Sequence, residues 1–220
     1  MRKRIAVIGV LSALAASMLS AAPAHAAGYR DSSVPPPTNK IVIDLVTVLG
    51  SGCPAGTSAV AVAPDNTAFT VSYSQYLAQV GVGATPTDFR KNCQLSLLVH
   101  VPQGFTYAIA AADYRGFASL VSGASGTERA NYYFQGYSQT TSISHVFNGP
   151  LTNDWEASDT TDVAQLVYLP CGVQRNFNIN TQLLVAAGTS NPTTTTSFMT
   201  MDSTDFSLAT IYRFSWKTCP

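Results

Sequence analysis

Charged side chains are scarce in this chain, which has only 12 Lys and Arg and 12 Asp and Glu among its 220 residues. Proteins that bind nucleic acid need dense basic clusters to neutralise phosphates, so no nucleic-acid partner is expected. Disordered chains combine high charge with few apolar residues, whereas 46% of these residues are hydrophobic. The composition therefore predicts a folded globular protein.

Recognisable catalytic motifs are also missing. The sequence has no Gly-x-Ser-x-Gly nucleophile elbow, no glycine-rich phosphate-binding loop and no Cys-x-x-Cys pair. Nucleophilic hydrolysis needs a nucleophile, a base and an oxyanion hole. Beyond the first 26 residues the histidines are His100 and His145, and both are expected to be solvated. The sequence therefore assigns no catalytic residue, metal ligand or cofactor.

The N-terminal residues have the pattern that is typical of an export signal. A basic start, Met1–Arg4, precedes an apolar stretch from Ile5 to Leu19, and Ala24-His25-Ala26 fits the small-x-small cleavage pattern. The alternative is an N-terminal membrane anchor, but this stretch is shorter than the roughly 20 residues that a spanning helix needs. Residues 1–26 are predicted to be a signal peptide, and no later segment is predicted to span a membrane. The remaining chain holds nine basic and twelve acidic groups, a net charge of about −3.

The four cysteines fit a secreted protein. An even number in an oxidising compartment predicts two disulfides. Four cysteines allow three connectivities, of which we expect the sequential one, Cys53–Cys93 with Cys171–Cys219.

Residues 27–39 contain Pro35-Pro36-Pro37 and predict a flexible Pro-rich arm, and residues 40–220 predict a single domain. Apolar and polar residues alternate clearly over Gln94–Val101 and Phe105–Asp113, as in strands with one buried face. Lys40–Leu49 is apolar on both faces and is expected to be a buried strand. About ten short strands without amphipathic helices predict an all-β fold, an antiparallel, jelly-roll-like β-sandwich, with a closed barrel as the alternative.

Mixed charges concentrate at two places, which is informative in a chain so poor in charge. The residues concerned are Asp88, Arg90, Lys91, Asn92, Asp113 and Arg115. An ion-pair network that fixes the loop before Cys93 is one interpretation, and a polar binding site is the other. Asp113 and Arg115 share strand parity, which predicts that their side chains lie on one face.

Aromatic side chains suggest a second candidate surface. By strand parity Tyr133 and Tyr137 share a face opposite to that of Tyr132 and Phe134. Exposed tyrosines could stack on sugar rings, and the row Asn178, Asn180 and Gln182 could hydrogen-bond their hydroxyls. Two packed sheets with a covering loop are the alternative explanation.

Acidic residues crowd the segment Leu151–Asp162, which is expected to be a polar loop. Asp154, Glu156, Asp159 and Asp162 could supply oxygen ligands to Ca²⁺, although their spacing is not that of an EF-hand. A solvated acidic loop is the alternative. Paired carboxylates could also serve glycoside hydrolysis, but the chain has only two glutamates, Glu128 and Glu156.

Phrases distributed along the chain, in order and with all four cysteines, resemble the secreted family called domain of unknown function 4360, found in bacteria and fungi. The match covers about residues 47–219, and its main phrases are Gly50-Ser51-Gly52-Cys53-Pro54, Arg90-Lys91-Asn92-Cys93-Gln94-Leu95, Val101-Pro102-Gln103-Gly104-Phe105, Asp113-Tyr114-Arg115-Gly116, Tyr132-Tyr133-Phe134-Gln135-Gly136, Pro170-Cys171-Gly172, Phe177-Asn178-Ile179-Asn180-Thr181, Asp202-Ser203-Thr204-Asp205 and Trp216-Lys217-Thr218-Cys219. The resemblance implies a small exported protein and supplies no mechanism.

Together these features predict a secreted protein that acts by binding or by building extracellular structure, with an extracellular polysaccharide or a cell-wall component as its partner. The alternative is a secreted hydrolase that uses carboxylates on extracellular glycans. A secreted inhibitor or toxin-like effector is a third class, on which the sequence is silent, as it is on the oligomeric state.

Overall fold

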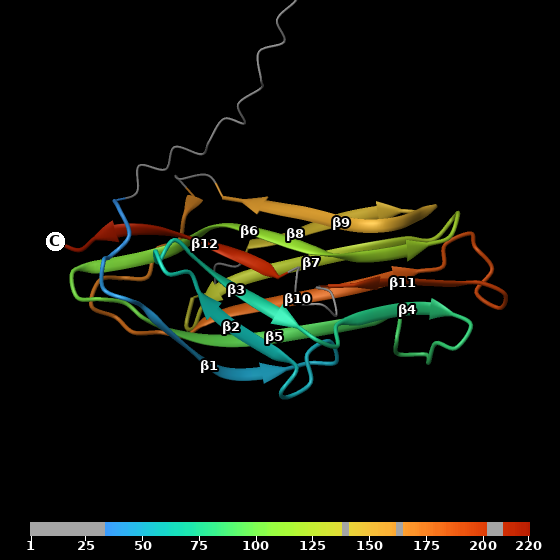
Figure 1. Ribbon diagram of the computed structural model, residues 1–220, viewed down its shortest axis with the longest axis horizontal. Helices are drawn as coiled ribbons and strands as arrows, with labels where there is room; N and C mark the ends of the chain where they lie inside the picture. The colour runs from blue at the N-terminus through green and yellow to red at the C-terminus, as the bar shows by residue number, and fades with distance from the viewer. Residues whose placement is uncertain (1–33, 138–140, 162–164, 202–208) are drawn as a thin grey trace, which may run out of the picture. The chain divides into compact units, whose positions relative to one another are not determined.

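The structure is a computed structural model that describes residues 34–137, 141–161, 165–201 and 209–220. The predicted signal peptide and the first part of the Pro-rich arm lie outside the described residues. The described chain contains twelve strands (Figure 1). They are β1 (Val42–Leu49), β2 (Ser58–Val62), β3 (Ala68–Tyr73), β4 (Leu77–Gly81), β5 (Arg90–His100), β6 (Phe105–Leu120), β7 (Ser125–Phe134), β8 (Thr141–Asn148), β9 (Leu151–Thr160), β10 (Phe177–Ala186), β11 (Thr196–Thr200) and β12 (Thr210–Thr218). No helix in this part of the chain is long and apolar enough to span a bilayer.

The strands form two antiparallel sheets that pack against each other. Sheet A has five strands in the order β1-β5-β10-β7-β8. Sheet B has seven, in the order β2-β3-β12-β6-β11-β4, with β9 also paired to β6. The predicted antiparallel β-sandwich is therefore confirmed.

Residue alternation places the core between the sheets. Leu95, Leu97 and Val99 of β5 are buried, as are Ile179 and Leu183 of β10, while their polar neighbours point outward. Sheet B adds an aromatic cluster in which Tyr107 and Phe214 contact edge to face and Phe214 packs on Trp216. Such pairs contribute about 0.5–1.5 kcal/mol each beyond the area they bury.

Two expectations for individual strands are wrong. β1 is not buried on both faces: it lies at the edge of sheet A, and its outward Val42 and Val46 are each 52% exposed. The segment expected to be an acidic loop is β9, whose ten residues pair with the second half of β6. Trp155, Ala157 and Asp159 are the fully buried residues of β9, and most of the others are polar, so its sequence is too polar to reveal a strand.

Both disulfides have the expected sequential connectivity. Cys53–Cys93 attaches the turn after β1 to β5, and Cys171–Cys219 attaches the end of β12 to the segment before β10. The arm contacts the domain where it is described, because Val34 donates its backbone N–H to the carbonyl of Trp216 and the Asn66 amide donates to the carbonyl of Pro37. The described chain therefore begins and ends beside β12.

Candidate functional site

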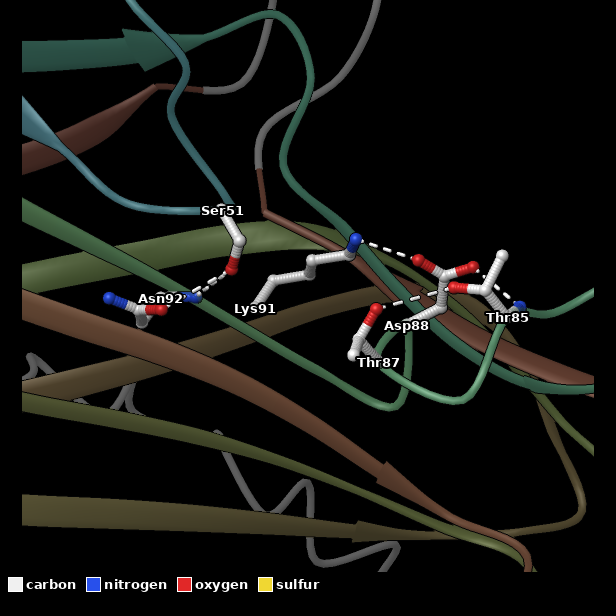
Figure 2. A network of polar contacts seen from close by, with 6 residues as sticks. All are labelled: Ser51, Thr85, Thr87, Asp88, Lys91 and Asn92. Carbon is white, nitrogen blue, oxygen red and sulfur yellow. Dashed lines mark hydrogen bonds and ion pairs between the residues drawn. The ribbon is translucent and has the colours of Figure 1, made fainter.

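The mixed-charge residues of the sequence prediction lie in separate places. Asp88 and Lys91 form an ion pair of 2.7 Å at the turn into β5, and Asp88 also accepts the backbone N–H of Thr85. The hydrogen bonds from Lys91 and Thr85 hold the pKa of Asp88 well below its usual range. Figure 2 shows this turn beside a second contact, in which the hydroxyl of Ser51 donates to the side-chain oxygen of Asn92. These bonds fix the loop before Cys93.

Asp113 and Arg115 lie on the other sheet, on the outward side of β6. Arg115 pairs with Glu156 at 2.9 Å, directly across the ladder on β9. Asp113 pairs with Arg213 of β12 and accepts a hydrogen bond from Ser158. The two residues share one face, but both are engaged in ion pairs and neither approaches the turn at Asp88 through any contact within the described residues.

Arg90 and Asn92 instead belong to a polar surface on the outward side of sheet A. This surface contains a hollow with a volume of about 590 Å³ over β5, β10 and β7. Its outward side chains are amides and guanidinium groups, with no carboxylate among them: Arg90, Asn92, Gln94, Arg129, Asn131, Asn180 and Gln182. We call these seven residues the polar hollow.

Strand register aligns the polar hollow in rows. Gln182 lies opposite Asn92 on one side and Arg129 on the other, and Asn180 lies opposite Gln94 and Asn131. Side chains directly across a ladder stand about 4.5–5.5 Å apart at their Cβ atoms. Ser142 and Ser144 of β8 continue the two rows on the far side of β7. Sequence reasoning identified Arg90, Asn92, Asn180 and Gln182 but missed Arg129, because register brings β7 beside β10.

Hydrogen bonds within the polar hollow leave much of its capacity open. Arg90 Nε donates to Gln182 Oε1 at 3.0 Å, and Asn180 Nδ2 donates to Asn131 Oδ1 at 3.2 Å. Arg129 Nε donates to the hydroxyl of Ser142 at 3.1 Å. Gln94 has no side-chain partner among the described residues. Each free amide group can both donate and accept, so the hollow can bind a polar ligand through several groups at once.

Tyr133 and Tyr137 do not form one surface. Tyr133 is the next outward residue of β7 after Asn131 and lies opposite Asn178, so its partly exposed ring borders the polar hollow. Tyr137 follows a turn in which its N–H donates to the carbonyl of Phe134. The turn ends the strand alternation, and Tyr137 packs against the ring of Phe134 with Arg175 over its own ring.

A second polar cluster lies inside the sandwich, beneath the inward side of β7. Asp159 of β9 is buried, and its carboxylate contacts His145 Nε2 at 2.6 Å and accepts the Tyr132 hydroxyl at 3.0 Å. Glu128 lies opposite His145 in the ladder and has no exposed surface. Neither carboxyl oxygen of Glu128 has a hydrogen-bond partner among the described residues. The sequence carries no signal for this cluster, since polar residues in strands usually point outward.

Burial sets the protonation of Glu128. Loss of hydration, with a further contribution from the charge of nearby Asp159, raises its pKa to about 9. Glu128 is therefore neutral at physiological pH, which is how the interior accommodates a carboxyl without a partner.

β9 also separates the acidic residues that were considered as Ca²⁺ ligands. Asp154 and Glu156 point outward, whereas Asp159 points into the core, and Asp162 lies outside the described residues. No three His, Cys, Asp or Glu side chains of the described chain are grouped so that they could hold a metal ion.

Comparison with known proteins finds a relative whose name gives no activity. The chain is 37% identical over 184 residues to a protein of Arthroderma benhamiae named "Uncharacterized secreted protein", a match that covers 84% of this chain and 74% of the relative. Among solved structures, the enzymatically active domain of the bacteriophage CBA120 tailspike protein 4 aligns with 79% of this chain at 11% identity. The chain spans 19% of the length of that protein, and the TM-score of 0.27 is too low to support an argument about fold or function.

The chain also matches a protein family, and this match covers almost the whole domain. Residues 39–219 match the family described as Domain of unknown function (DUF4360). This range includes every described strand and all four cysteines. The protein is secreted, and it belongs to the DUF4360 family.

Proposed function

We propose that this secreted protein is a non-enzymatic module that binds extracellular carbohydrate through the polar hollow of sheet A. The observation that supports this proposal best is the arrangement of five amide side chains and two arginines in aligned rows on three adjacent strands. Sugar hydroxyls both donate and accept hydrogen bonds, and amides do the same. Rows of amides therefore match the chemistry of a polyhydroxylated chain.

The neighbourhood of the hollow supports the same ligand class. Tyr133 lies at its border and offers a ring on which a sugar could stack. The supporting backbone is rigid, because β5 and β10 pair with strands on both sides and Cys93 ties β5 to Cys53. A site built on paired strands holds its side chains more firmly than one on loops, which lowers the entropic cost of binding.

A carboxylate-dependent hydrolase is the second candidate function, and the pair Glu128 and Asp159 favours it. Glycoside hydrolysis combines one protonated and one ionised carboxyl group, and the raised pKa of Glu128 suits the protonated partner. However, Glu128 has no exposed surface through which a substrate could reach it. Binding at the accessible polar hollow is the better-supported function.

The test is retention of the purified, oxidised protein on insoluble glycans and on the cell wall of the producing organism. We expect wild type to be retained and the double variant Gln94→Ala/Asn180→Ala to be lost from the same material. Tyr133→Ala should weaken retention. The control is Gln79→Ala, which removes an outward amide from β4 in sheet B and should change nothing. The proposal fails if wild type is not retained on any glycan, or if the double variant is retained as well as wild type.

A further inference from the structure

We propose that the ligand of the polar hollow is an acidic polysaccharide, whose carboxylate or sulfate groups are bound by Arg90 and Arg129. The inference rests on the proposed function and narrows its ligand class. It follows from the position of the two guanidinium groups, from their unused donors and from the distribution of acidic groups around them.

The two arginines flank the central strand of the hollow from opposite sides. Arg90 begins β5 and reaches Gln182 on β10, and Arg129 on β7 lies directly opposite the same Gln182. β5 and β7 are separated by β10, so their backbones are about 10 Å apart. A polymer that crosses the strands over Gln182 would meet one arginine and then the other.

Each guanidinium group uses only its Nε–H within the protein. Arg90 donates Nε to an amide oxygen, and Arg129 donates Nε to a hydroxyl group. The two terminal amino groups of each guanidinium carry four N–H donors in all. In Arg90 and in Arg129 none of these four donors has a partner among the described residues. A carboxylate or a sulfate can accept two such donors together, which makes a strong and directional contact.

No carboxylate of the described chain neutralises these arginines. The acidic groups near sheet A are engaged elsewhere, because Asp88 pairs with Lys91 and Asp44 pairs with His100 near the other end of β5. Glu128, although adjacent to Arg129 in sequence, points into the core and is protonated. The polar hollow is therefore a basic site on a chain whose formal net charge is about −3 without the predicted signal peptide, or about −2 with Glu128 protonated.

That net charge makes the inference specific. An acidic protein repels polyanions as a whole, so attraction to an acidic polymer must come from a local site. Binding through two exposed arginines should also weaken as salt screens the charges, whereas binding to hydroxyl groups through amides should not.

The experiment compares one polymer with and without its charge, using polygalacturonate and its methyl ester as probes for the full secreted protein. We expect at least tenfold tighter binding to polygalacturonate at low ionic strength, and we expect this preference to shrink in 0.5 M NaCl. Arg90→Gln and Arg129→Gln should each remove most of the preference for the charged polymer. Arg90→Lys should restore part of it. The matched control, Arg115→Gln on sheet B, should keep the preference.

Each contrary outcome has a separate meaning. Equal binding of wild type to both polymers at every salt concentration overturns the acidic specificity and leaves carbohydrate binding standing. An equal loss of preference in Arg115→Gln overturns the assignment to the polar hollow. If neither polymer binds, the acidic ligand is wrong. If every insoluble glycan also fails to retain the protein, the proposed function is wrong as well.

Discussion

The outward faces of the two sheets carry arginines in different surroundings. On sheet B, Arg115 and Arg213 pair with Glu156 and Asp113, so the face is close to neutral. On sheet A, Arg90 and Arg129 have amides and a hydroxyl as partners, and their charges remain uncompensated within the described chain. The arginines of sheet B are therefore paired with carboxylates of the protein itself, whereas those of sheet A keep N–H donors that are free to bind a ligand.

Two consecutive residues of β7 differ in the same way, because one points to the outward side of sheet A and the other to its inward side. Arg129 faces solvent and remains charged without a carboxylate partner, whereas Glu128 faces the core and is neutral. Water stabilises the outward charge, and protonation removes the inward one. The same lack of an ionic partner therefore leads to a charged group outside and to a protonated acid inside.

The largest expected effect concerns the inner side of β7. Glu128 has a pKa of about 9 in the folded protein against an ordinary value of 4.5. A raised pKa means that the folded state holds the proton more firmly, so its stabilising effect is full below pH 4.5 and is lost as the pH rises toward 9. The free energy of unfolding should fall by roughly 1.4 kcal/mol per pH unit over this range.

Glu128→Gln should flatten that dependence, because an amide of similar shape does not titrate. Urea denaturation of both proteins between pH 5 and pH 9 measures it. The matched control is Glu156→Gln, which changes the other glutamate of the chain and should leave the slope as in wild type. An unchanged slope in Glu128→Gln would show that another group is responsible.

The second prediction gives sheet A the charge pairing of sheet B. Gln182→Glu places a carboxylate next to Arg90 Nε and opposite Arg129, with little change in shape. Both arginines gain an internal partner, so affinity for an acidic polymer should fall at least tenfold while the melting temperature stays within a few degrees of wild type. Affinity electrophoresis and thermal denaturation measure the two quantities. Undiminished binding would show that the arginines act independently of Gln182.

The third prediction makes the opposite change on sheet B. Glu156→Gln frees Arg115 from its exposed partner. Exposed ion pairs contribute about 0–1 kcal/mol, so the loss of stability should be small and should shrink further at high salt. Glycan binding should not change, as β6 and β9 have no part in the polar hollow. A gain in acidic binding equal to that at sheet A would remove the distinction between the faces.

The smallest expected effect is that of calcium. Because β9 directs Asp154 and Glu156 to one side and Asp159 to the other, their oxygens cannot surround one ion. Adding millimolar CaCl₂ should shift the melting temperature no more than MgCl₂ at equal ionic strength. A rise specific to Ca²⁺ would require ligands outside the described residues.

Much of the fold could be predicted from the sequence, because burial of one strand face leaves a period of two. Gln94–Val101 and the row from Phe177 to Val185 showed this period, and both are strands with the expected inward residues. β9 was missed because its inward positions include Asp159 and its outward positions are all polar or acidic. Alternation identifies a strand only where the core side is apolar.

The candidate site was predictable only in its components. The polar alternation of Asn180 and Gln182 was visible, as was the charge at Arg90. Their position beside Arg129 depends on which strands pair, and β5, β10 and β7 are distant in sequence. The burial of Glu128 could not be predicted, because the identity of a single residue does not show whether its side chain lies in the core or in solvent.

The termini of the described chain bear on how the protein can be displayed. Val34 donates its backbone N–H to Trp216 of β12, and Cys219, directly after β12, is bonded to Cys171. Both ends of the described chain therefore lie beside β12, where Figure 1 marks the C-terminus. A linker or reporter joined after β12 would emerge from the sheet that does not carry the polar hollow. Attachment through the residues after β12 should therefore leave the polar hollow of sheet A accessible, an orientation that suits sensors and affinity supports.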